Sequence, residues 1–288
     1  MKEIMRVERK QEVLSLVTDI SYCHTPSWYG ATFTDLKMDL ILPKIRAGHK
    51  PCPAILWLCG GAYMVVDKSI WLPEMMRFAR NGYVVASAQY RTSNGATFPE
   101  PLMDVKAAIR FLKAHAEEFC IDPEHIFVMG ESAGGALASL AGTTSKRKEL
   151  DVGDYLDQDS SVCGVVSFYG PAVMQEAKAL QKAVGDGDTV VPDWTMSAYL
   201  GTGFTLEQYA ASCAATYLDD GGIPPFMLVQ GAEDKVVTLS MSDRFYEELT
   251  AHGVETEYLI VEGAQHGDDL LYQDEVIGKI MEFLARHI

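Results

Sequence analysis

Residues 130–135 read GESAGG, a G-x-S-x-G pattern centred on Ser132. They follow the apolar run HIFVM and precede a run of small residues, ALASLAG, so they lie between an expected strand and an expected helix. At such a sharp turn, side chains at Gly130 and Gly134 would collide with the neighbouring strand and helix. The start of the helix also directs backbone N–H groups toward a developing anion. The pattern predicts a nucleophile at Ser132; the alternative is a tight turn in which Ser132 caps the helix.

A serine hydroxyl needs a neighbouring base to act as a nucleophile at neutral pH, and position distinguishes one of the seven histidines. His266 lies in residues 263–267 (GAQHG), after the apolar run at residues 255–261 and before the last helix-like stretch. Active sites of α/β sheets form in loops at the carboxyl ends of parallel strands. We therefore expect His266 to be the base; the alternative is a loop histidine without a role.

A carboxylate that orients the base is expected between the serine and the histidine in chain order, after the end of a strand. The strand expected over residues 225–230 is followed by the sequence GAEDKVV. We select Asp234 over its neighbour Glu233, because the shorter side chain holds an imidazole more rigidly from a fixed loop. The alternative role for Asp234 is to cap the helix that is expected to begin near Leu239.

Backbone donors for an oxyanion are expected in residues 59–63 (CGGAY), which follow the first buried apolar run. Paired glycines allow backbone N–H groups to approach a ligand closely. We predict that Gly60 and Gly61, together with Ala133, donate three N–H groups to the oxyanion. Losing one such donor typically costs a factor of about 100 to 1,000 in turnover.

Strand-like and helix-like segments alternate along most of the chain. Strands are expected at residues 12–21, 34–42, 54–59, 83–88, 125–129, 162–168, 225–230 and 255–261, and helices at residues 69–81, 99–119, 132–144, 240–252 and 272–287. The first two strands have no helix between them and should form an antiparallel edge, whereas the others form crossover units. The predicted fold class is α/β: a mostly parallel, twisted, eight-stranded sheet with helices on both faces, in one domain spanning residues 1–288.

An insertion at residues 171–222 interrupts this alternation. It contains the acidic, glycine-rich sequence GDGDT and several aromatic residues. We expect a small helical cap or lid over the site; the alternative is a surface excursion without a function. Trp194 and Tyr199 of the insertion, with Tyr63 of the glycine loop, are candidate substrate-binding residues, although aromatic spacing in a cap also fits a small core of its own.

Composition excludes several other classes of function. Among 288 residues, 40 acidic side chains outnumber 24 basic ones, and the formal charge of −16 disfavours nucleic-acid or membrane partners. There is no apolar run of about 18 residues and no secretory signal. Six cysteines without a CxxC pair indicate a reduced, cytoplasmic protein. We expect no metal or cofactor, and the sequence leaves open whether the chain forms a homodimer.

Four motifs in chain order resemble those of the α/β-hydrolase superfamily: LWLCGGAY, GESAGGALA, PPFMLVQGAEDKVV and EGAQHG. The resemblance runs from about residue 39 to the end of the chain and points to the hormone-sensitive-lipase-like and acetylxylan/feruloyl-esterase-like (BD-FAE-type) serine esterases. It implies a nucleophile, a base, an orienting acid and three N–H donors at Ser132, His266, Asp234, Gly60, Gly61 and Ala133.

The chain departs from the family pattern at two positions. Cys59 stands where the family usually has histidine, and Ala62 where it often has a third glycine. Because the usual histidine braces the loop and does not attack substrate, Cys59 bears on loop geometry more than on chemistry. A nucleophilic role for Cys59 is an alternative for which no base is assigned.

The resemblance implies a serine carboxylesterase that acts on a small-molecule ester, with acetyl or hydroxycinnamoyl groups on carbohydrates as candidate substrates. We expect acetyl and butyryl esters to react better than octanoyl esters. One alternative is an amide or peptide hydrolase with the same triad, similar to an aminopeptidase or an arylformamidase. Another is a non-catalytic small-molecule receptor on the same fold.

Overall fold

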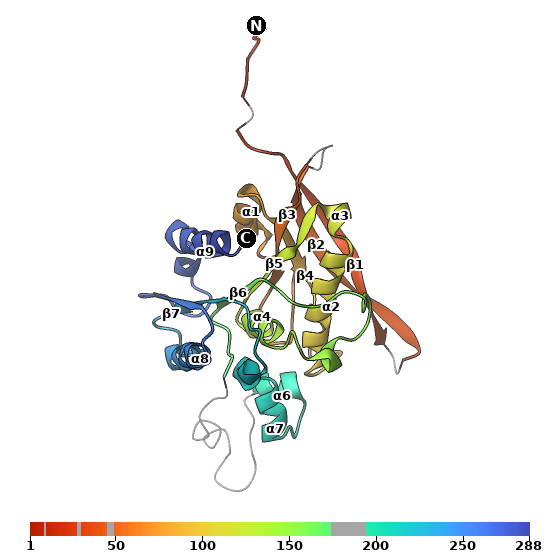
Figure 1. Ribbon diagram of the computed structural model, residues 1–288, viewed down its shortest axis with the longest axis vertical. Coiled ribbons are helices and arrows are strands. Elements are labelled where there is room, and N and C mark those ends of the chain that lie inside the picture. The colour runs from red at the N-terminus through yellow and green to blue at the C-terminus, as the bar shows by residue number, and fades with distance from the viewer. Residues whose placement is uncertain (9, 28–29, 45–48, 174–193) are drawn as a thin grey trace.

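The computed structural model describes residues 1–8, 10–27, 30–44, 49–173 and 194–288, and within these ranges eight strands form one sheet (Figure 1). The strands lie in the order β1-β2-β4-β3-β5-β6-β7-β8. β2 is antiparallel to both of its neighbours, whereas every pairing from β4 to β8 is parallel. The predicted fold class and its antiparallel edge are therefore confirmed.

The elements agree with the predicted ones except at their ends and in one helix. The strands are β1 (Leu14–Ser27), β2 (Thr32–Pro43), β3 (Cys52–Leu58), β4 (Val84–Ala88), β5 (Ile121–Glu131), β6 (Gly164–Phe168), β7 (Phe226–Gly231) and β8 (Thr256–Val261). The longer helices are α1 (Leu72–Arg80), α2 (Glu100–Ala114), α4 (Ala133–Thr143), α8 (Leu239–Ala251) and α9 (Asp274–Arg286). The single helix predicted over residues 99–119 is divided at His115 into α2 and the short α3 (Ala116–Phe119).

The central strands are buried on both faces. β4, β6 and β7 are buried at every residue, which is why they are continuous apolar runs and do not alternate. Two apolar clusters flank the sheet. α1 and α9 contribute to the cluster on one face, and α2, α4 and α8 contribute to the cluster on the other (Figure 1).

α4 consists mostly of small residues, and all of them are buried. Their size lets the helix lie close against the sheet. A Cβ atom on Gly142 would be 2.4 Å from Cγ2 of Val165, and one on Gly135 would be 2.8 Å from the carbonyl oxygen of Phe168. This close packing fixes the start of α4, and with it Ser132, relative to β5 and β6.

The described part of the insertion contributes α6 (Trp194–Leu200), α7 (Leu206–Ala211) and the 3-10 helix η2 (Ala214–Asp220). In the view of Figure 1, α6 and α7 lie at the end of the molecule opposite the N-terminus. η2 contacts both α4 and α8. Residues 174–193, which include GDGDT, lie outside the described residues, so the cap over residues 171–222 stays a prediction, as does the single domain.

Candidate active site

Ser132 occupies the sharp turn that the sequence predicts between β5 and α4. Its backbone is left-handed, with φ of 53° and ψ of −120°, a conformation that L residues rarely adopt. The two flanking glycines permit the turn: a Cβ on Gly130 would lie 2.5 Å from the carbonyl oxygen of Gly134, and one on Gly134 would lie 2.1 Å from that of Leu58. The amide of Ser132 donates to Phe168, which holds the turn against β6.

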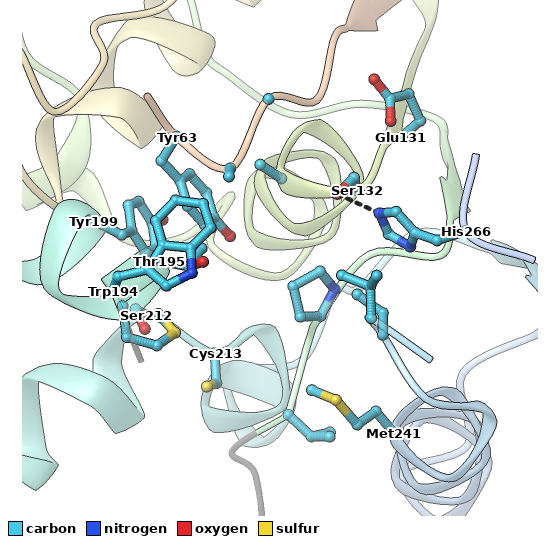
Figure 2. A pocket seen from close by; sticks show the side chains of 18 of the residues that line it. Tyr63, Glu131, Ser132, Trp194, Thr195, Tyr199, Ser212, Cys213, Met241 and His266 are labelled. Atoms are coloured by element: carbon cyan, nitrogen blue, oxygen red, sulfur yellow. Dashed lines mark hydrogen bonds between the residues drawn. The ribbon is translucent and has the colours of Figure 1, made fainter. Parts of the chain in front are cut away.

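The imidazole of His266 connects Ser132 to Asp234. Its Nε2 atom lies 3.0 Å from Oγ of Ser132 (Figure 2), and its Nδ1 atom lies 2.8 Å from Oδ2 of Asp234. The ring edge contacts Tyr169, with the two ring centroids 4.7 Å apart. The three residues follow β5, β7 and β8, so the carboxyl ends of parallel strands bring them together.

Asp234 is buried, whereas the rival Glu233 is exposed. Oδ1 of Asp234 accepts the amides of Val236 and Val237 at 2.8 and 3.0 Å. The helix cap at α8 is Thr238 and not Asp234. Burial acts to raise the pKa of Asp234, but the hydrogen bonds with His266 and the two amides outweigh burial, so its pKa lies below the ordinary value. The carboxylate is therefore ionised at neutral pH and holds Nδ1 of His266 protonated.

The structure contradicts the role predicted for Gly60. Its N–H donates to Oε1 of Glu131, and Gly60 does not line the cavity at Ser132. Gly61, Ala62 and Ala133 do line that cavity, and their N–H groups have no hydrogen-bond partner among the described residues. Ala62, which we did not select, lines the cavity where Gly60 does not. The signal that pointed to it was its position where the family often has a third glycine.

The cavity beside Ser132 has a volume of about 520 Å³ and a mostly apolar lining. All three candidate substrate-binding residues line it (Figure 2). Tyr63 and Tyr199 are buried and stack face to face, with centroids 3.6 Å apart, while Trp194 is 61% exposed at the rim. Sequence reasoning missed the other apolar lining residues, which include Pro171, Val173, Met196, Val236, Val237 and Met241.

Cys59 is buried and does not line the cavity. Its carbonyl oxygen accepts the Tyr90 hydroxyl at 2.6 Å, so the backbone at this position braces the loop. Burial, followed by the nearby charge of Glu131, raises the pKa of the Cys59 thiol to about 12. A thiol in this state is not a nucleophile at neutral pH.

Among the described residues, no group of three or more histidine, cysteine, aspartate or glutamate side chains is arranged to hold a metal ion. In the same part of the chain, no helix is both long and apolar enough to cross a bilayer.

The mostly parallel sheet, with a strained serine turn between β5 and α4, defines this chain as an α/β-hydrolase. The family model BD-FAE matches residues 38–249, well over half of the chain. The chain therefore belongs to the BD-FAE family, and the resemblance seen in its motifs is confirmed.

Named relatives are consistent with this assignment. The chain is 29% identical to esterase LipC of Mycobacterium tuberculosis over 226 residues, which are 77% of this chain and 54% of LipC. It spans about half the length of the curated relatives it matches. A bifunctional GH43-CE protein of Bacteroides eggerthii is 29% identical, with a TM-score of 0.79 over 94% of this chain and 38% of that chain. A truncated carbohydrate esterase from gut microbiota, 22% identical, has the same fold, with a TM-score of 0.78 over 97% and 98% of the two chains.

Proposed function

We propose that this chain is a serine esterase that hydrolyses short-chain acyl esters, acetyl or hydroxycinnamoyl, through an acyl-enzyme intermediate. The observation that carries the proposal is the imidazole of His266, which is within hydrogen-bond distance of both Ser132 Oγ and Asp234 Oδ2. A nucleophile, a base and an orienting carboxylate in one line are what acyl transfer by serine requires.

In the first half of the reaction, Nε2 of His266 takes the hydroxyl proton as Ser132 Oγ attacks the ester carbonyl. The oxyanion that forms accepts the N–H groups of Gly61, Ala62 and Ala133, which line the cavity. His266 then gives the proton to the departing alcohol. In the second half, the same imidazole deprotonates water, which attacks the acyl-serine. Nε2 then returns that proton to Ser132 Oγ as the acyl–oxygen bond breaks and the acid leaves, while Asp234 keeps Nδ1 protonated throughout.

The volume and the lining of the cavity indicate which acyl groups it can bind. A volume of about 520 Å³ falls within the usual range for small-molecule pockets. The stacked pair of Tyr63 and Tyr199 offers a flat apolar wall, suited to a planar hydroxycinnamoyl group as well as to acetyl. For the alcohol half, LipC is named an esterase and the gut-microbiota neighbour a carbohydrate esterase, so acylated sugars are the substrates to test first.

The test combines a covalent probe with a substrate panel. Paraoxon should add one diethylphosphoryl group, located by peptide mass spectrometry at Ser132. The panel is p-nitrophenyl acetate, butyrate and octanoate, methyl ferulate, acetylated xylo-oligosaccharides and an acetanilide matched to the acetate. We expect turnover of the esters with a higher kcat/KM than the anilide. A higher kcat/KM for the anilide would make the enzyme an amidase, and neither labelling nor turnover would favour a non-catalytic receptor.

A further inference from the structure

Glu131 is a buried carboxylate, 9% exposed, that the reaction outlined above does not use. It immediately precedes Ser132, at the end of β5. It lines the cavity, and Figure 2 shows it on the opposite side of Ser132 from Met241. Burial raises the pKa of Glu131, against the opposing effects of its hydrogen bonds with Gly60 and Trp71. A buried acid of this kind is costly unless its oxygen atoms are satisfied, so its partners indicate what it does.

A single oxygen atom of Glu131 holds both ends of one loop. Oε1 accepts the backbone N–H of Gly60, two residues after the end of β3, and the indole N–H of Trp71, directly before α1, the latter at 3.3 Å. Gly61 and Ala62, the loop residues that line the cavity and whose N–H groups have no hydrogen-bond partner among the described residues, lie between these two ends. The carboxylate therefore closes the loop at its base.

The partners of Glu131 are themselves fixed. The indole of Trp71 stacks on Tyr272 with centroids 4.4 Å apart. A Cβ atom on Gly60 would lie 2.6 Å from both carboxylate oxygens. A side chain at position 60 would therefore displace the carboxylate of Glu131, so glycine at this position preserves the contact between Glu131 and the loop.

We propose that Glu131 is a positioning residue that aligns the two halves of the oxyanion hole. One half, the amides of Gly61 and Ala62, belongs to the loop after β3; the other, the amide of Ala133, belongs to the turn after β5. Because Glu131 is bonded covalently to Ser132 and by hydrogen bonds to the loop, it sets the distance between the halves. The proposal rests on the esterase function above and adds a residue that lines the cavity and acts through its hydrogen bonds with the loop.

Two variants separate the hydrogen bond from the charge. Glu131→Gln keeps the length of the side chain and an oxygen that can accept from Gly60 and Trp71, but it loses the charge. Glu131→Asp keeps the charge but is shorter by one methylene, so its oxygen withdraws from both donors. In Glu131→Asp the loop donors should be misaligned while Ala133 stays in place. We expect kcat to fall about 100-fold, which is the lower end of the effect of losing one oxyanion donor.

The experiment measures kcat and KM on p-nitrophenyl acetate per active site titrated with paraoxon, and the Ki of a trifluoromethyl ketone, which mimics the tetrahedral intermediate. We expect Glu131→Asp to lower kcat about 100-fold with little change in KM and to raise the Ki by a similar factor. Glu131→Gln should retain at least about a tenth of the wild-type kcat. A loss of kcat in Glu131→Gln that equals or exceeds the loss in Glu131→Asp would show that an acceptor oxygen at this distance does not preserve kcat, and it would overturn the proposal.

Hydrogen exchange of the loop amides provides a readout that does not depend on esterase activity. In Glu131→Asp, the peptide that contains Gly60 should exchange faster than in the wild type, whereas in Glu131→Gln it should exchange at the wild-type rate. If the peptide that contains Gly60 exchanges at the wild-type rate in Glu131→Asp, then Glu131 does not hold the loop and the proposal is wrong. If the wild type hydrolyses no ester of the panel, the proposed function fails, and the exchange result still decides whether Glu131 holds the loop.

Discussion

Replacing Asp234 by asparagine should move the ring proton of the neutral His266 imidazole from Nδ1 to Nε2. Oδ1 of Asp234 accepts two backbone amides, those of Val236 at 2.8 Å and Val237 at 3.0 Å. Asparagine can satisfy both amides only with its carbonyl oxygen in that place, so its NH2 group must take the place of Oδ2. That position is 2.8 Å from Nδ1 of His266. Because the NH2 group donates, Nδ1 must accept, and the imidazole proton moves to Nε2.

The resulting tautomer presents an N–H to Ser132 Oγ, 3.0 Å away, and cannot remove the hydroxyl proton. Wrong tautomer selection in a serine triad costs about 10⁴-fold in kcat, about 5.5 kcal/mol of activation free energy. The new NH2 group also faces the Nε2 donor of Gln230, which bonds Oδ2 at 3.2 Å in the wild type. This clash should lower the free energy of unfolding by about 1–3 kcal/mol.

The assay is kcat on p-nitrophenyl acetate per active site, with protein concentration corrected for the folded fraction by circular dichroism. Glu233→Gln is the matched control, because it makes the same chemical change one residue away on an exposed side chain, and it should change kcat less than twofold, about 0.4 kcal/mol. Retention of more than a tenth of the wild-type kcat by Asp234→Asn would refute the tautomer argument, and a larger loss in Glu233→Gln would transfer the orienting role to Glu233.

Three further outcomes are expected. Ser132→Ala should remove about six orders of magnitude of turnover and all paraoxon labelling while leaving the circular dichroism spectrum unchanged; residual labelling elsewhere would identify another nucleophile. Because the pKa of Cys59 is about 12, only about one part in 10⁴ is thiolate at pH 8, so iodoacetamide at that pH should leave Cys59 unmodified and the activity intact; inactivation that tracks alkylation of Cys59 would contradict its burial. Trp194→Ala should raise the KM for methyl ferulate about fivefold, equivalent to about 1 kcal/mol of lost ring contact, and change kinetics on p-nitrophenyl acetate little; equal effects on both substrates would place Trp194 outside the acyl subsite.

The order of motifs was sufficient to predict which side chains meet, because each motif follows a strand of the parallel part of the sheet and parallel strands end at one edge. Ser132, Asp234 and His266 lie where that reasoning puts them. The direction in which a loop amide points cannot be predicted from the sequence in the same way. The N–H of Gly60 is bound by Glu131, which is 71 residues away in the chain, and no local pattern reveals this contact.

Other differences between the predicted and the observed structure also arise from tertiary contacts. β5 begins at Ile121, earlier than its apolar run, because Ile121 pairs with Cys52 at the start of β3. The cavity wall combines Met241 of α8 with Tyr63 of the glycine loop and Tyr199 of α6. Only the packing of these three elements brings the side chains together, so hydrophobic periodicity identifies each helix without indicating that the helices share a pocket.

Among the strands that the structure describes, β8 is bonded to β7 alone and forms the margin of the sheet, and the loop that carries His266 follows it. Ser132, by contrast, follows β5 in the interior of the sheet. Marginal strands detach at a lower free-energy cost than the centre of a domain. Partial denaturation should therefore withdraw the imidazole while the serine turn is still intact, so hydrolysis would cease before the spectroscopic signal of the core is lost. Resistance of this enzyme to heat or urea is thus set by the attachment of its last strand, and that strand is the place to reinforce it.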